Sequence, residues 1–329
     1  MRLPRPRGPL SAHVLRMLEA GSPTDTGIEC RAEVIRDADV QLTLWVLYEL
    51  AYRGFDHVPD RLEWDPDLLR LRGRLEVLFE DELRRSVRGL VDSVRDVADA
   101  AEQVLAMVAR TDGVSLSTFL RREATRDQVL EYLRERSVQQ LKESDPQSFL
   151  LPRIAGAAKA ALAEIQYDEY GAGDPALLHQ ELYARALAAA GLDPTYGAYV
   201  DEVSAVSLAS ANVMSLFCLN RRLRGAALGH FAAFEASSSV PSRRVAAGIE
   251  RVGLAAEVSA YFDEHVEADA VHEQIAARDV CGTWVAEHPD LRDDVLMGAA
   301  AALHLDALSA EDLMSRWQTT EVEGMGEAS

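Results

Sequence analysis

The stretch YFDEHVEADAVHEQIAA, residues 261–277, has the apolar spacing of a core-facing helix but also carries two histidines and an aspartate. On a helix that turns by about 100° per residue, Asp269 lies roughly 40° to one side of His265 and His272 roughly 20° to the other. The three side chains therefore share one stripe. Apolar residues flank this stripe, and the opposite face carries Asp263, Glu267 and Gln274. The stripe is expected to face the core, where three aligned polar groups are costly unless each has a partner.

A bound metal is the simplest partner for this stripe. The stripe extends roughly 10 Å along the helix axis, which is more than one ion needs, so it has room for two metals with Asp269 between them. The alternative interpretation is a set of separate core histidines and solvated acids with no shared ligand.

Helical periodicity extends over nearly the whole chain. The segment DADVQLTLWVLYELAYRG, residues 37–54, has apolar residues at helical spacing, and Gly54 is placed to end the helix. Alternating β-branched runs are almost absent, so the sequence predicts an all-α fold. Residues 1–25 and 319–329 lack periodicity and are expected to be disordered tails.

The polar segment ESDPQS, residues 143–148, is the best internal boundary. It divides a helical N-terminal region, residues 26–142, from a second helical set, residues 143–318. The sequence leaves open whether these are two domains or one continuous bundle.

Composition limits the possible partners and the compartment. The 329 residues carry a net charge of −20 and the pI is near 4.8, which argues against nucleic acid and anionic membranes as partners. The three cysteines are widely spaced and form no CxxC pair, as is typical of a reducing cytoplasm. No apolar run approaches the roughly 20 residues of a membrane span. We expect a soluble, cytoplasmic protein.

Helical periodicity also places other acids and a histidine toward the core. Glu169 shares a face with apolar residues of the segment 151–171, whereas Glu164 points the other way. His179 and Glu235 are core-facing by the same criterion. A straight helix would hold Glu169 and His179 about 15 Å apart, so the intervening GAGDP must bend the chain if the two share a site.

These residues resemble the metal-binding pattern of the heme-oxygenase-like diiron oxidases, also called iron-containing redox enzymes. The pattern E(x25)E(x9)H(x55)E(x29)H(x3)D(x2)H is met by Glu143, Glu169, His179, Glu235, His265, Asp269 and His272. The resemblance covers residues 135–280 and implies a heme-oxygenase-like helical bundle with an N-terminal helical extension. It implies no heme.

The resemblance further implies that these seven residues bind two iron ions. Four carboxylates and two Fe(II) ions leave the cluster near neutral, so that it can be buried. Carboxylate and imidazole ligands suit iron or manganese, and the sequence has neither HExxH nor the ExxH of ferritin-type diiron proteins.

The pattern is most similar to the N-oxygenase branch, in which Glu143 is the carboxylate that six-ligand, C–C-cleaving relatives lack. Two N-terminal segments, WVLYELAYRGF at 45–55 and LEWDPDLLRLR at 62–72, are similar to the helical region that precedes the domain in actinobacterial members. In those relatives this region supports dimerisation, so the resemblance implies a homodimer.

The implied activity is reduction of O2 by the diferrous site to a peroxo-diferric intermediate. This species would oxygenate the nitrogen of a small-molecule amine in natural-product biosynthesis, with electrons from an external reductant. One alternative is an oxidative desaturase or C–C lyase acting on an amino or fatty acid. A second alternative is a non-catalytic helical binding protein.

Overall fold

The computed structural model describes residues 1–20, 33–110 and 115–327, and for residues 267–270 and 320–327 it describes the backbone alone. Across these ranges the secondary structure consists of helices and no strand, so the predicted all-α class is confirmed. Within the same ranges, no helix combines the length and apolarity that crossing a bilayer requires.

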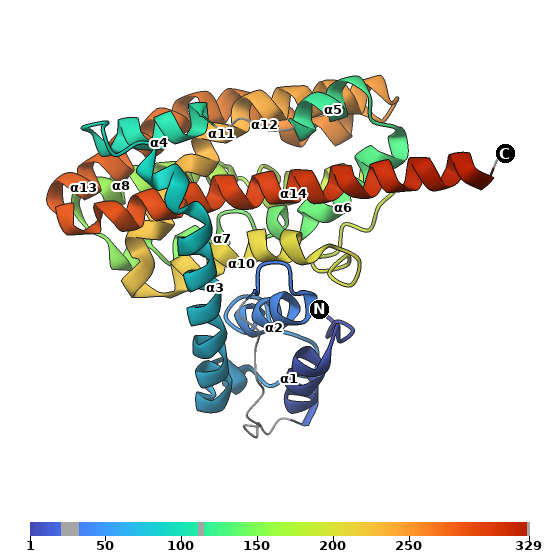
Figure 1. Ribbon diagram of the computed structural model, residues 1–329, viewed down its shortest axis with the longest axis horizontal. Helices are drawn as coiled ribbons and strands as arrows, with labels where there is room; N and C mark the ends of the chain where they lie inside the picture. Colours follow the sequence, from blue (N-terminus) through green and yellow to red (C-terminus); the bar gives the residue numbers. More distant parts are fainter. Residues whose placement is uncertain (21–32, 111–114, 328–329) are drawn as a thin grey trace.

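The helices form a bundle with a smaller helical lobe on one side (Figure 1). The N-terminal part contains α1 (Pro9–Ala20), α2 (Ala38–Glu49), α3 (Pro66–Asp92), α4 (Ala100–Ala109) and α5 (Leu116–Arg122). The following part contains α6 (Arg126–Gln140), α7 (Asp145–Ser148), α8 (Gly156–Glu169), α9 (His179–Ala189) and α10 (Ala205–Leu219). The last part contains α11 (Arg224–Arg251), α12 (Ala256–Gln274), a π-helix (Ile275–Gly282), α13 (Thr283–Glu287) and α14 (Arg292–Glu327).

Helix α11 is the centre of the bundle, because it packs against both α12 and α14. Its contact with α14 depends on two glycines. A Cβ atom at Gly229 would collide with the carbonyl of Val295, and one at Gly298 would collide with the carbonyl of Ala226. The two backbones therefore touch directly, as small residues at a helix crossing permit.

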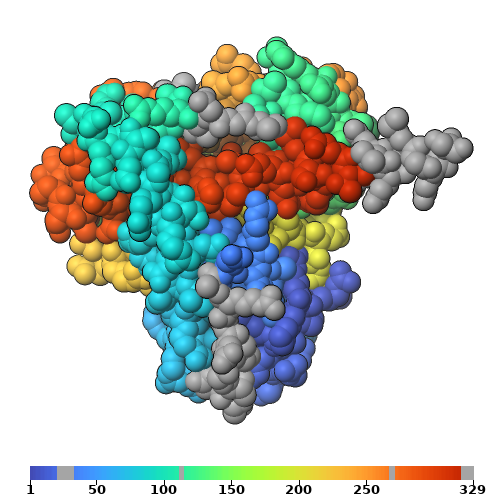
Figure 2. Space-filling model, viewed as in Figure 1, coloured from blue at the N-terminus to red at the C-terminus, as the bar shows by residue number. Residues whose placement is uncertain are grey.

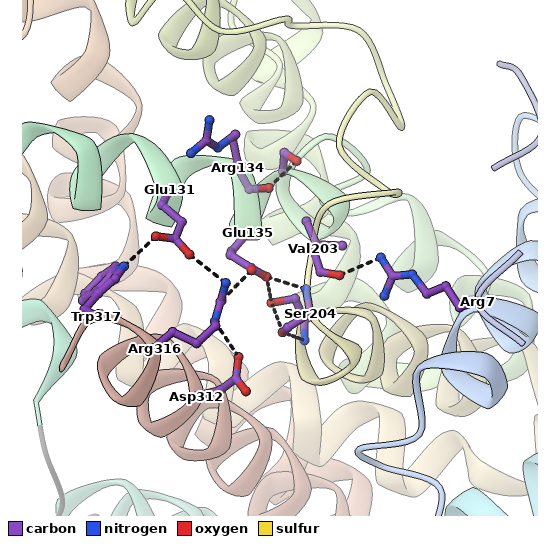
Figure 3. A network of polar contacts seen from close by, with 11 residues as sticks. Arg7, Glu131, Arg134, Glu135, Val203, Ser204, Asp312, Arg316 and Trp317 are labelled. Atoms are coloured by element: carbon purple, nitrogen blue, oxygen red, sulfur yellow. Dashed lines mark hydrogen bonds and ion pairs between the residues drawn. The ribbon is translucent and has the colours of Figure 1, made fainter. Parts of the chain in front are cut away.

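Helix α6 is held against α14 by a polar network (Figure 3). Arg316 donates to Glu131 at 2.7 Å and to the buried Glu135 at 2.6 Å, and Glu135 also accepts the backbone N–H of Ser204 at 3.0 Å. Trp317 donates its indole N–H to Glu131 at 2.6 Å. These contacts hold α6 in place, and the turn that contains Glu143 follows the end of α6 at Gln140.

The N-terminal residues differ from the expected disordered tail over 1–25. Residues Pro9–Ala20 form α1, whose side chains Leu10, Val14 and Leu18 are buried. These residues recur at helical spacing, but the surrounding Pro and Gly obscured the pattern. In the space-filling view, this part of the chain lies at the lower end of the molecule (Figure 2), and α1 packs against α2. Residues 21–25 lie outside the described part of the chain.

The sequence left open whether the regions on either side of residues 142–143 are two domains or one continuous bundle. One hydrophobic core contains both Leu10 and Leu305, so it continues across the expected boundary at residues 142–143. At the other end, the α14 backbone continues to Glu327, past residue 319, where a disordered tail was expected.

Candidate metal centre

The candidate ligands come from five segments that meet inside the bundle. Glu143 lies in the turn after α6, Glu169 ends α8, His179 begins α9, Glu235 is on α11, and α12 carries both His265 and His272. All six side chains are buried, none being more than 7% exposed. Glu164, expected to be solvated, is exposed.

The bend expected between Glu169 and His179 is present. Gly171, Ala172 and Gly173 all have positive φ angles, and they reverse the chain between α8 and α9. A side chain at Gly171 would collide with the backbone of Leu177, so glycine is required here. The reversal brings Nδ1 of His179 to 3.0 Å from Oε2 of Glu169.

The six residues form two clusters, each able to hold a metal ion. Glu143, His179 and His265 each place one possible ligand atom within 4.8 Å of the others. In this first cluster, His265 Nε2 is 3.5 Å from Glu143 Oε1, and the rings of His179 and His265 have their centroids 4.6 Å apart.

The second cluster contains Glu169, Glu235 and His272, again with ligand atoms within 4.8 Å of one another. Nδ1 of His272 lies 3.5 Å from Glu235 Oε2 and 3.7 Å from Glu169 Oε1. The other oxygen of Glu169 faces His179 of the first cluster. Glu169 therefore lies between the clusters, with one oxygen toward each.

The charges in this buried region are strongly coupled. Burial alone would raise the pKa of Glu169, but contact with His179 lowers it to about 2. Burial would lower the pKa of His272, but Glu235 and Asp168 raise it to about 9. Burial raises the pKa of Glu235. Positive charge among these carboxylates is therefore favourable, and bound cations would meet the same requirement.

Two ring nitrogens show that the residues fit metal ions. Nδ1 of His179 and Nδ1 of His272 are buried, yet neither has hydrogen-bonding geometry to the carboxylate that it faces. A buried nitrogen without a hydrogen bond is costly, whereas a metal ion would accept its lone pair. A mixed carboxylate and imidazole set is typical of iron and manganese sites.

Neighbouring groups orient the ligands. The carbonyl oxygen of Tyr261 lies 2.7 Å from Nδ1 of His265 and must accept its N–H, which leaves Nε2 toward Glu143. The Tyr261 hydroxyl donates to Glu143 Oε2 at 2.8 Å. Ser144, in the left-handed conformation with φ of 68°, donates to Glu169 Oε2 at 3.0 Å.

Asp168 contacts the candidate ligand His272, a role that helical periodicity did not predict. Its carboxylate is 3.2 Å from Nε2 of His272, on the side of the ring opposite the cluster. Asp168 is half exposed and precedes a core-facing residue, so the apolar pattern gives no sign of its role. The carboxylate fixes the His272 ring with Nδ1 facing inward.

Asp269 was the seventh predicted ligand. Its backbone lies in α12 between His265 and His272, but its side chain is outside the described part of the structure, so its ligation stays a prediction.

A pocket adjoins both clusters. Its lining residues include three of the candidate ligands together with amide, hydroxyl and apolar side chains. They are Gln139, Gln140, Glu143, Ser144, Gln147, Glu169, Met214, Phe231, Phe234 and Glu235. Its free volume of about 10 Å³ has room for roughly one water molecule beside Glu143, Glu169 and Glu235.

The part of the chain that contains the candidate ligands is similar to a known family of iron-containing proteins. The profile of the iron-containing redox enzymes matches residues 130–307, a range that contains all six described candidate ligands and Asp269. A solved structure of a CADD-like protein of unknown function from Nostoc punctiforme has a similar fold, with a TM-score of 0.52 and 16% sequence identity. The alignment covers 66% of this chain and 96% of that one. No curated protein matches this chain. Because the profile matches more than half of the chain, the protein belongs to the iron-containing redox enzyme family.

Proposed function

We propose that the protein is a non-heme diiron oxygenase that uses O2 and an external reductant to oxygenate the nitrogen of a small-molecule amine. The observation that carries this proposal is the pair of adjacent clusters with Glu169 between them. One cluster would hold a metal through Glu143, His179 and His265, and the other through Glu169, Glu235 and His272.

Two Fe(II) ions in these positions would supply one electron each for the two-electron reduction of O2. The protein positions the ligands and excludes water, because all six described side chains are buried. Tyr261 and Ser144 hold the carboxylates of Glu143 and Glu169 by hydrogen bonds, so neither carboxylate is free to turn away.

Glu143 supports the N-oxygenase assignment over the desaturase or lyase alternative. It lies in the first cluster with both histidines and is held there by Tyr261. This carboxylate is the feature by which the sequence resembles N-oxygenases rather than six-ligand relatives. A natural-product role would follow from the same resemblance.

The test combines metal binding with product analysis. Anaerobic titration should give two Fe(II) per chain, and addition of O2, a reductant and a panel of primary amines should give products heavier by one oxygen atom. Loss of two hydrogens or of a carbon fragment instead would favour the desaturase or lyase. Less than one iron per chain and no O2 consumption would favour a non-catalytic binding protein.

A further inference from the structure

A series of aromatic side chains runs from the first cluster toward the surface. The ring of His265 lies beside that of Tyr261, with the two centroids 4.3 Å apart. The centroid of Phe262 is 5.1 Å from that of Tyr261 and 6.5 Å from that of Tyr132 on α6. Tyr261 and Phe262 are only 2% and 4% exposed, whereas Tyr132 is half-buried. The series therefore connects a candidate ligand with a residue that water reaches.

Tyr261 has the partners of a tyrosine that can be oxidised. A phenol gives up its proton when it loses an electron, because the radical cation is a very strong acid. The Tyr261 hydroxyl donates to Glu143 Oε2 at 2.8 Å, so an acceptor for this proton is already in place. The hydroxyl also accepts from Gln140 Nε2 at 2.6 Å, which keeps its hydrogen directed at Glu143. Oxidation of Tyr261 therefore leaves a neutral radical and no buried cation.

A second tyrosine that contacts Tyr261 lacks such a partner. The ring centroid of Tyr183 lies 4.8 Å from that of Tyr261, closer than the centroid of Phe262. The Tyr183 hydroxyl donates to the carbonyl of Leu133 at 2.8 Å, and its side chain is completely buried. A backbone carbonyl is too weak a base to take up a phenolic proton. Electrons should therefore reach Tyr261 from Tyr132, which can release its proton to water, and not from Tyr183.

We propose that Tyr261 and Tyr132, with Phe262 between them, conduct single electrons between the metal centre and the protein surface. The route discharges an oxidised iron centre when no substrate is present, which protects the ligands from oxidation. The inference rests on the proposed function for the iron centre and for O2, but it does not require nitrogen oxygenation.

Electrons and protons balance along the route. Tyr261 gives one electron to the oxidised iron centre and its phenolic proton to Glu143. The Tyr261 radical then takes one electron from Tyr132 and regains the proton from Glu143, while Tyr132 releases its own proton to water. A reductant in solution restores Tyr132 with one electron, and water returns the proton.

The route can be tested in metal-free protein by driving it inward from the surface. Light-generated tris(bipyridine)ruthenium(III) is a one-electron oxidant that is too bulky to reach the Tyr261 side chain, which is 2% exposed. Tryptic peptides 252–278 and 127–134 contain Tyr261 and Tyr132 as their single tyrosines, so mass spectrometry locates the oxidised residue. Tyr167 is 59% exposed and serves as the internal standard for direct attack by the oxidant.

Tyr132→Phe should lose most of the oxidation at Tyr261, because the outer end of the route then has no residue that the oxidant can oxidise. Tyr183→Phe is the matched control. It removes the same hydroxyl group from the other tyrosine that contacts Tyr261, and it should leave oxidation at Tyr261 at the wild-type level. Oxidation at Tyr167 should be equal in all three proteins.

Oxidation at Tyr261 that Tyr132→Phe leaves unchanged overturns the inference, as do equal losses in Tyr132→Phe and Tyr183→Phe. The inference also fails if wild-type protein is oxidised at Tyr167 and not at Tyr261. None of these results depends on iron, O2 or an amine. Failure of the proposed function is therefore distinct, since it would appear as absent iron binding or absent amine oxygenation with the metal-free result unaffected.

Discussion

Nζ of Lys142 lies 2.8 Å from Oε1 of Glu49, and both side chains are completely buried. Glu49 ends α2 in the N-terminal region, while Lys142 directly precedes the candidate ligand Glu143. The hydroxyl of Tyr196 lies 2.8 Å from each oxygen of Glu49 and completes its partners. The N-terminal region thus fixes the turn that presents Glu143 to the first cluster.

Removing one member of this pair should be strongly destabilising. Glu49→Ala leaves the Lys142 charge buried without its partner, and we expect a loss of roughly 3–5 kcal/mol in the free energy of unfolding. Chemical denaturation measures the change. The double variant Glu49→Leu, Lys142→Met removes both charges and should recover most of the stability; a double variant as unstable as Glu49→Ala would show that the charge pair is not the cause.

Glu143→Ala should lower iron binding from two ions to one per chain. Glu143 is the only carboxylate among the three residues of the first cluster, and the variant removes it. Elemental analysis after anaerobic loading measures the stoichiometry. Glu164→Ala is the control, since Glu164 is exposed on α8. Two irons and unchanged turnover in Glu143→Ala would refute ligation by Glu143.

Asp168→Asn should weaken iron binding by roughly 10–100-fold, because the His272 ring loses the carboxylate that holds it. Competition with a chelator measures the affinity. Asp263→Asn makes the same chemical change at an exposed position of α12 and should have no effect. Equal affinities for the two variants would count against a role for Asp168 in positioning His272.

His230 should make stability depend on pH. It is buried against Phe217, and burial lowers its pKa from 6.5 to about 4. The folded protein therefore keeps His230 neutral while the unfolded chain takes up a proton, so the stabilisation is complete above pH 6.5 and is lost as the pH falls from 6.5 toward 4. Denaturation at pH 7 and pH 5 should show a smaller loss of stability in His230→Gln than in the wild type. Equal losses would mean that His230 titrates normally in the folded state.

Gly298→Ala should destabilise the protein by more than about 1 kcal/mol, because its methyl group would collide with the backbone of α11. Gly89→Ala is the matched control, since nothing lies within 4 Å of the position of its Cβ in α3. That control should be neutral or stabilising, because alanine favours a helix. Thermal unfolding compares them, and similar melting temperatures would rule out a tight α11–α14 contact.

Much of the candidate site could be predicted because helical periodicity indicates which side chains face the core. His265 and His272 lie about two turns apart, so their shared face follows from the helix alone. The same argument placed Glu169, His179 and Glu235 inside the bundle, where all three are buried. Asp168 was not predicted, because its side chain is half exposed and helical periodicity identifies only residues that face the core.

The sequence by itself determined the all-α class, the core-facing acids and histidines, and the need for a bend between Glu169 and His179. Only the tertiary structure decided how these residues divide into two clusters, because distances between helices depend on packing rather than on spacing within a helix. The stretch 261–277 could not show that His265 meets Glu143 while His272 meets Glu235. Nor could it show the Lys142–Glu49 pair, since that contact depends on segments far apart in the sequence that packing alone brings together.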